Sequence, residues 1–320
     1  MMTIKNKKGF EFSFGWIFAI IVGAVILFLA LYAVSNIVKD ERKISDTEAG
    51  KQLGIILSPL ETGIGSNKIT LIHFPIETRI YNDCDIYGNF GEQKISIATK
   101  SGVGNAWDKP GKPSIFYNKY IFSPSIIEGK DSTAFSKSLA LPFKVTDLIY
   151  LIPPEDYCFV NPPRAIEQEI IDSSPKNINV SLSIAECKKG SKKICFGSFR
   201  DSKCNTFVDI QEKSVRKGSS KVYYEDDSEN SLLYSAIFAE PEIYECQLKR
   251  LMKRTTELSL LYIAKSQALS PRGCSSNLEL DIQIYANATL SFNNSADLPK
   301  IIFMSEELKR RNGLLSCSLF

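Results

Sequence analysis

A long apolar run near the N-terminus dominates the hydrophobic pattern of the chain. Residues 12–38 carry no charged side chain, and Lys39 is the first charge after Glu11. A helix rises about 1.5 Å per residue, so roughly 20 apolar residues cross a hydrocarbon core of about 30 Å. The pattern therefore predicts a single transmembrane helix at residues 12–38, preceded by a short basic segment at residues 1–11.

The next stretch, residues 39–65, is polar and has few apolar positions. Ile44, Leu53 and Ile56 are the sparse apolar points, and Pro59 is followed by glycines at positions 63 and 65. Proline and glycine stop a helix, and the two glycines favour a turn. We expect the membrane helix to continue here as a helical juxtamembrane stalk.

Short apolar segments separated by glycine and proline fill residues 66–135. Residues 69–81, 93–99 and 114–123 have the composition of strands, which predicts a β-rich region. His73, the single histidine, lies in the first of these segments. We expect it to have an ordinary structural partner rather than a catalytic role.

Strands and helices are expected to alternate in residues 136–320. Residues 145–152 and 177–185 predict strands on either side of a helix at residues 164–171, the arrangement of a covered sheet. Residues 214–224 and 231–238 predict two more strands, with a solvated acidic turn at residues 225–227 between them. The fold class is therefore α+β or α/β.

The longest amphipathic pattern of this domain covers residues 240–268. Apolar residues recur there at helical spacing, which predicts one stripe packed on a sheet. The members of the stripe are Tyr244, Leu248, Leu251, Leu258 and Tyr262. Four basic residues are predicted to form an exposed face of the same helix: Lys249, Arg250, Lys253 and Arg254.

Two shorter helices are expected near the C-terminus. Ser276 and Glu279 have the spacing of a capping box, which favours a helix at residues 278–290, although alternating apolar residues there also fit a strand. Residues 305–311 predict a second helix. The apolar tail that follows is expected to dock against the fold.

Composition changes this picture mainly by what it excludes. Apolar residues at 44% and charged residues at 23% are typical of a globular protein, and a net charge of +3 gives no reason to expect a nucleic-acid partner. The chain has no CxxC motif, zinc spacing, Walker lysine or dinucleotide fingerprint. We therefore expect no metal site and no cofactor.

The cysteines bear on the compartment. All eight lie after the apolar run, which favours an oxidising, extracytoplasmic location, with free thiols in a cytosolic domain as the alternative. Their pairing cannot be deduced from spacing. Cys187 and Cys195 flank a lysine-rich segment that is predicted to be a hairpin tip, so they are a candidate bridge, and Cys204 is an equal competitor.

Orientation depends on weaker signals. Three basic residues on each flank of the apolar run tie the positive-inside count. Three candidate glycosylation sequons, like the cysteines, favour a domain outside the cytoplasm, and their acceptors are Asn179, Asn287 and Asn293.

The N-terminal segment resembles a known family. Lys5, Lys7, Lys8 and Gly9 precede Phe10 and the apolar run, which is similar to the class III signal of type IV pilin-like and archaellin-like proteins. The resemblance covers about the first 38 residues and implies cleavage after the glycine. The filament glutamate of that family falls at Phe14 here, and Glu11 is the nearest acid. We expect a retained signal-anchor, with cleavage after Gly9 as the alternative.

These patterns favour a single-pass surface protein with a structural or binding role, accessory to a pilin-like assembly. Its expected partners are the lipid bilayer and a membrane helix or surface protein; Ala19 and Gly23 provide a small-residue step for helix pairing. One alternative is a surface hydrolase that uses a carboxylate pair, with Glu155 and Asp156 as the first candidates. The other is a cytosol-facing membrane scaffold with reduced cysteines.

Overall fold

The structure is a computed structural model of the chain and describes residues 14–62, 69–100, 106–197, 202–227 and 229–320. These residues form an α+β fold, which confirms the predicted class. The chain divides into two units, Met1–Ser45 and Asp46–Phe320. The predicted basic leader at residues 1–11 and the predicted turn at residues 63–65 lie outside the described residues.

The first unit contains most of α1, which runs from Phe14 to Ile56. Every described residue from 14 to 38 is exposed, and the helical segment Phe14–Glu61 includes a window with a mean hydropathy of 3.0. It is the one helix among the described residues that is long and apolar enough to cross a membrane. The predicted apolar helix is therefore present.

The predicted stalk is helical, but its second half belongs to the folded unit. α1 continues to Ile56, and the short helix α2 follows at Ser58–Glu61. Leu53, Leu57 and Leu60 are at most 2% exposed and pack on the first sheet. Their steps of four and three residues place them on one helical face. Of the apolar points named from the sequence, Leu53 belongs to this face, whereas Ile44 and Ile56 are exposed.

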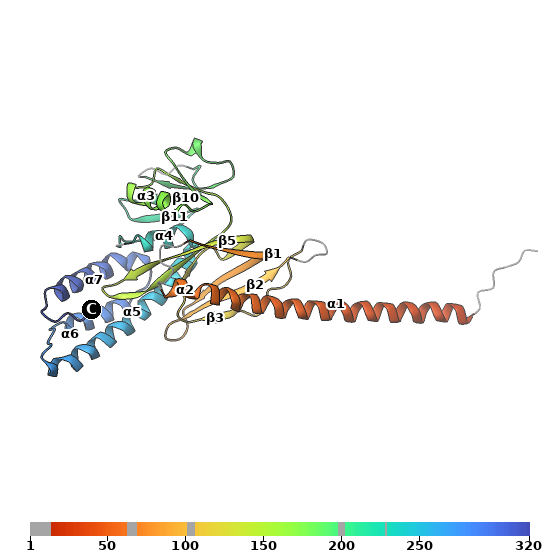
Figure 1. Ribbon diagram of the computed structural model, residues 1–320, viewed down its shortest axis with the longest axis horizontal. Coiled ribbons are helices and arrows are strands. Elements are labelled where there is room, and N and C mark those ends of the chain that lie inside the picture. Colours follow the sequence, from red (N-terminus) through yellow and green to blue (C-terminus); the bar gives the residue numbers. More distant parts are fainter. Residues whose placement is uncertain (1–13, 63–68, 101–105, 198–201, 228) are drawn as a thin grey trace, which may run out of the picture. The chain divides into compact units, whose positions relative to one another are not determined.

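The first sheet has six strands in the order β3-β2-β1-β5-β6-β4 (Figure 1). All neighbours are antiparallel except β4 and β6. The predicted boundary at residue 135 falls inside β5, so the β-rich region and the following domain share this sheet. The strands are β1 (Thr70–Asp85), β2 (Glu92–Thr99), β3 (Ser114–Phe116), β4 (Ile121–Phe122), β5 (Ile126–Ala140) and β6 (Lys144–Ile152).

β1 is interrupted by a shift in its register with β5 between His73 and Thr78. Pro75 lies in this interval and cannot donate to a ladder, which explains the break. His73 lies 2.7 Å from the Asp131 carboxylate through its Nδ1 atom, and both side chains are exposed. The histidine therefore has a structural partner on the neighbouring strand.

The second sheet has the order β12-β11-β10-β9-β7-β8. The four strands from β10 to β8 are parallel, and β10, β11 and β12 are joined by antiparallel pairing. Helix α3 (Arg164–Ser173) connects β7 to β8. The strands are β7 (Tyr157–Val160), β8 (Ile178–Ser181), β9 (Lys192–Phe196), β10 (Thr206–Asp209), β11 (Ser214–Lys217) and β12 (Ser220–Tyr223).

Three predictions about this sheet need correction. The strand predicted at residues 177–185 ends at Ser181, and a 3-10 turn follows at Ile184–Glu186. The lysine-rich segment before β9 is not a hairpin tip, because β8 and β9 lie on opposite sides of β7 and do not pair. The strand–helix–strand unit is present, but its first strand is β7 rather than the predicted residues 145–152.

The segment predicted as a strand at residues 231–238 is helix α4 (Ser231–Phe238). All eight residues are buried, so neither helical nor strand periodicity is visible in its sequence. The Asp227 carboxylate accepts the backbone N–H groups of Ser231 and Leu232, each at 2.9 Å. Asp227, from the predicted acidic turn, therefore binds the free N–H groups at the N-terminus of α4.

Helix α4 joins the two sheets. The Phe238 ring centroid lies 6.3 Å from that of Tyr150 on the first sheet and 5.8 Å from that of Tyr157 on the second. In Figure 1, α4 lies between β5 and the labelled strands β10 and β11. One large apolar core therefore spans both sheets and the C-terminal helices.

The long predicted helix is α5 (Pro241–Leu269), and its stripe is confirmed at Tyr244, Leu248 and Leu251, which are fully buried. Its predicted exposed basic face is wrong. Arg250 is 0% exposed, and Arg254 donates from Nε to the Val145 carbonyl at 2.8 Å. These cations bind backbone carbonyls that other parts of the fold supply.

The two last helices are α6 (Glu279–Leu290) and α7 (Leu298–Gly313), with 3-10 turns at Ser270–Arg272 and Ser295–Asp297. The helical reading of the α6 segment is confirmed, whereas the capping box is wrong, because Glu279 accepts a hydrogen bond from Ser266 instead. α7 starts earlier than predicted. In the tail, Leu319 is buried but Leu314 is 74% exposed. The predicted docking of the tail against the fold is therefore confirmed only in part.

All eight cysteines form disulfides. The candidate Cys187–Cys195 bridge is wrong: Cys187 follows the 3-10 turn after β8, Cys195 lies on β9, and β8 and β9 do not form a hairpin. The competitor Cys204 pairs with Cys195, and Cys187 pairs with Cys158. Both bridges join a small core on one face of the second sheet. The other two bridges are Cys84–Cys246 and Cys274–Cys317.

We expect Lys217 to make stability depend on pH. Its ammonium donates to the Ala239 carbonyl after α4. Burial lowers the pKa of Lys217 from 10.5 to about 7; the Glu240 charge opposes this shift, and repulsion from Lys192 adds a smaller contribution to it. Because the unfolded chain keeps this proton up to its higher pKa, stability should rise by roughly 1–2 kcal/mol from pH 7 to pH 9. Urea titrations of the wild type and Lys217→Met should show that the variant loses this rise. Equal slopes in both proteins would contradict the assignment.

Candidate functional site

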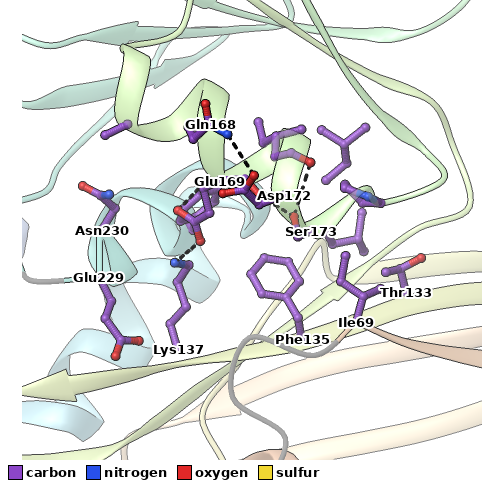
Figure 2. Close-up of a pocket in the computed structure, with 16 residues that line it drawn as sticks. Ile69, Thr133, Phe135, Lys137, Gln168, Glu169, Asp172, Ser173, Glu229 and Asn230 are labelled. Carbon is purple, nitrogen blue, oxygen red and sulfur yellow. Dashed lines mark hydrogen bonds and ion pairs between the residues drawn. The ribbon is translucent and has the colours of Figure 1, made fainter.

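A cleft of about 630 Å³ opens between the first sheet and helix α3. Its sides come from β5, from α3 and from the start of α4, as Figure 2 shows. The volume lies within the range of small-molecule sites, roughly 300–1,000 Å³. The cleft is therefore the best candidate for a ligand-binding site among the described residues.

Strand and helix periodicity explain which side chains face the cleft. Thr133, Phe135 and Lys137 alternate along β5, so they share one face of the sheet. Glu169 and Asp172 lie three residues apart on α3 and therefore on neighbouring positions of one helical face. Figure 2 shows Lys137 and Glu169 pointing toward one another from these two elements.

A fixed charge pair lies at the centre of the cleft. The buried Lys137 ammonium forms an ion pair with Glu169 and lies 4.9 Å from the centre of the Tyr234 ring. The Tyr234 hydroxyl donates to the second oxygen of Glu169 at 3.0 Å. Burial, together with the nearby Glu169 charge, raises the pKa of Tyr234 well above its usual value, so the hydroxyl remains a donor.

Other polar groups in the cleft are open to a ligand. Thr133 is only 6% exposed, yet its hydroxyl has no hydrogen-bond partner within the described ranges. The Asn230 side-chain amide lines the cleft and likewise has no partner there. Glu229 accepts the Ser138 N–H at 2.8 Å. These groups can exchange bonds with a ligand at little cost to the fold.

The charge of the cleft is negative. One lysine faces three carboxylates, from Glu169, Asp172 and Glu229. Apolar side chains, including Phe135 and Ile152, complete the lining. Such a cleft favours a ligand with a cationic group and an apolar body. In the part of the chain that the structure describes, no group of three acidic, histidine or cysteine side chains is placed to hold a metal ion.

We expect Glu169 to matter more for stability than its neighbour Asp172. Glu169→Ala leaves the buried Lys137 without its counter-ion, at a cost of roughly 1–3 kcal/mol. Asp172→Asn changes an exposed residue that accepts a hydrogen bond from Gln168 at 2.8 Å, so its effect should stay within about 0.5 kcal/mol. Urea denaturation of both variants measures the difference. Equal losses would show that the ion pair is not a fixed part of the site.

The two carboxylates that the sequence analysis proposed as a catalytic pair lie outside the cleft. Glu155 and Asp156 follow β6 and form ion pairs with Lys192 and Lys188, respectively. Neither lines the cleft. Each acid neutralises part of the lysine-rich segment before β9, and a catalytic role for the pair stays a prediction.

The candidate glycosylation sites are spread over the second unit. Asn179 lies on β8, whereas Asn287 lies on α6 and Asn293 follows that helix. All three side chains are exposed. None of them lines the cleft, and glycosylation remains a prediction.

Sequence reasoning missed the cleft itself. Lys137 and Glu169 are 32 positions apart, and β5, which carries the lysine, was not predicted as a strand. Residues 131–139 show no clean alternation of apolar and polar residues, because the buried positions of this strand include Ser132, Ser136 and Lys137. These polar residues hid the strand from the sequence analysis.

Comparison with protein-family models, curated proteins and solved structures finds no match to this chain.

Proposed function

We propose that the chain is a single-pass membrane protein whose second unit lies outside the cytoplasm and binds a small cationic ligand in the cleft. The observation that carries the proposal is the disulfide pairing of all eight cysteines in a chain with one apolar helix. Disulfides persist in oxidising compartments and are rare in the cytosol. This supports an external location over a cytosolic scaffold.

The ligand class follows from the charge and the open polar groups of the cleft. The carboxylates of Asp172 and Glu229 supply negative potential, while Lys137 is already paired with Glu169. The Thr133 hydroxyl and the Asn230 amide, which have no partner among the described residues, can bind a hydroxyl or amide of the ligand. An amine with an apolar body and one further polar group fits this arrangement.

The location is tested by thiol labelling of intact cells. A membrane-impermeant maleimide should label the protein only after treatment with a membrane-impermeant reductant, because the cysteines are then released outside. A cytosolic protein with a free thiol is the control for intact membranes. Labelling that requires lysis, or that needs no reductant, would reject the external location.

Ligand binding is tested with phenethylammonium as the probe and phenylpropionate as its anionic counterpart, by calorimetry on the full chain in micelles. The ammonium should bind more tightly than the carboxylate by about tenfold or more. Glu229→Gln should reduce that preference, whereas Glu306→Gln on the exposed face of α7 should not. Equal binding of the two probes would reject the cationic ligand, and the proposal of an external location would be unaffected.

An accessory role in a pilin-like assembly is a further part of the proposal, supported by the basic leader and the apolar helix that follows it. N-terminal sequencing of the membrane-extracted protein tests it. A mature chain that begins at Phe10 supports processing as a pilin-like precursor, and an intact N-terminus supports a retained signal-anchor.

A further inference from the structure

Each of the two sheets ends in two edge strands, β3 and β4 in the first and β12 and β8 in the second. An edge strand presents unpaired backbone N–H and C=O groups, which attract another strand unless they are covered. The four edges differ in how far other parts of the fold cover them.

Side chains close three of these edges. The Tyr223 N–H of β12 donates to the Ser295 hydroxyl at 2.9 Å, and its carbonyl accepts from the Tyr244 hydroxyl at 2.8 Å. The Ile121 carbonyl of β4 accepts from the Gln247 amide at 3.2 Å. The Phe116 carbonyl of β3 accepts from Arg250 at 3.4 Å.

The edge of β8 is open. Tyr157 donates to the Asn177 carbonyl at 2.7 Å and Asn161 to the Ser181 carbonyl at 2.8 Å, so the odd-numbered residues of this segment bond with β7. Parallel pairing then directs the backbone groups of Val180 away from β7. No described residue bonds the Val180 N–H or C=O.

A groove follows this open edge. Its volume is about 570 Å³, and it lies between β8 and α3, next to the ligand cleft, with which it shares Ile170, Pro175 and Ile178. Two of its apolar residues are exposed, Ile171 by 55% and Leu182 by 78%. Ile178 and Val180 continue the apolar lining along the strand. Side chains at alternate positions of an added strand would meet these residues.

The groove also selects for charge. Glu167 and Glu186 line it, and no described lysine or arginine does. The Ser181 hydroxyl, followed by backbone N–H groups of Leu182 and Ser183, lowers the pKa of Glu186 and keeps its carboxylate ionised. A partner segment with a basic residue therefore matches the groove better than an acidic one.

We propose that the open edge of β8 and the groove along α3 bind an extended polypeptide segment of a partner protein as an added strand. The segment carries apolar residues at alternate positions and at least one lysine or arginine. Backbone hydrogen bonds to Val180 provide affinity, and the groove provides specificity. The groove borders the cleft of the proposed function, but Val180, Ile171 and Leu182 line the groove and not the cleft, and the proposal does not depend on a ligand in the cleft.

Val180→Pro is the decisive variant. It removes the outward N–H group but no ladder bond, and edge strands tolerate proline where the N–H faces solvent. Ile171→Ser shortens an exposed apolar side chain on the groove, and Leu290→Ser makes the same kind of change on α6 as a matched control. Circular dichroism and disulfide mapping establish that each variant folds.

The full chain in nanodiscs is used to select binders from a phage-displayed library of random 12-residue peptides, and selected peptides are synthesised with a fluorescent label. We expect alternating apolar residues with a net positive charge. Affinity should fall by about tenfold or more with Val180→Pro and about threefold or more with Ile171→Ser, but stay within about twofold with Leu290→Ser. Hydrogen exchange should show protection of residues 176–183 when peptide is bound.

Three outcomes would overturn the proposal. The first is a selection that yields no peptide whose binding Val180→Pro weakens. The second is full affinity for peptides with N-methylated backbones, which cannot form a strand. The third is a preference for acidic peptides. If Val180→Pro fails to fold, Ile171→Ser and the exchange measurement decide the question, since neither alters the backbone of β8.

Discussion

Replacing Arg250 with methionine is expected to lower the free energy of unfolding by roughly 3–5 kcal/mol, because a fully buried cation holds several loops together. Burial lowers the pKa of Arg250 to about 10, so the surroundings oppose its charge. The guanidinium nevertheless remains in the core because every donor finds an acceptor.

The acceptors come from separate parts of the chain. Nε donates to the Phe90 carbonyl at 3.1 Å, and Nη1 donates to the Lys119 carbonyl at 2.9 Å and to Gln247 at 2.8 Å. Nη2 donates to the Tyr117 carbonyl at 3.0 Å. All these acceptors are neutral. Methionine fills part of the volume but leaves the carbonyls buried without donors. A buried acceptor without a donor costs the full free energy of its desolvation.

Two matched variants separate this role from general effects. Arg250→Lys keeps the charge but has a compact ammonium in place of the planar fork, so it should recover only part of the lost stability. Lys249→Met removes the charge of the neighbouring residue, whose ammonium has no partner within the described ranges. This variant should change the free energy of unfolding by less than about 0.5 kcal/mol. Urea denaturation followed by near-ultraviolet circular dichroism measures all three. If Arg250→Met behaves like Lys249→Met, the guanidinium is not a structural centre.

The apolar helix and the stripe of α5 could be predicted because each depends on residues close in sequence. A run without charges and a repeat at helical spacing report on local burial alone. Arg250 shows the limit of the same reasoning. Helical spacing places it beside polar positions, but the carbonyls that satisfy it belong to residues more than 130 positions away.

The segment at residues 231–238 failed for a different reason. It is apolar at nearly every position and buried on all sides, so its pattern cannot distinguish a helix from a strand. Asp227 was the available signal, since an acid just before a helix accepts free N–H groups. The interpretation of residues 225–227 as a solvated turn hides this capping role.

The cleft could not be predicted because its residues meet only through tertiary structure. Lys137 lies on β5 of the first sheet, a strand rich in serine. Its partner Glu169 lies on α3, the helix that connects two strands of the second sheet. The disulfide pairing failed for the same reason: Cys158 and Cys187 become neighbours through the order of strands in the second sheet. Local patterns contain no information on that order.

Removing the Cys84–Cys246 bridge is expected to lower the free energy of unfolding by roughly 2–5 kcal/mol, more than removal of any other disulfide. The bridge joins the end of β1 to α5 across 162 positions. A cross-link stabilises mainly by restricting the unfolded chain, and the restriction grows with the length of the closed loop. Cys246 also lies one helical turn before Arg250, so both residues attach the same part of α5 to the region after β1.

The Cys195–Cys204 bridge provides the matched comparison, because it closes only 9 positions. In the chain-entropy account, the two double Cys→Ser variants should differ by about 2 kcal/mol, with the longer loop losing more. Urea denaturation of each variant under non-reducing conditions measures the difference. Equal losses, or a larger loss for the short loop, would mean that local packing of the bridges rather than loop length sets their contribution. A Cys84→Ser/Cys246→Ser protein as stable as the wild type would show that the Arg250 contacts alone hold α5 to the first sheet.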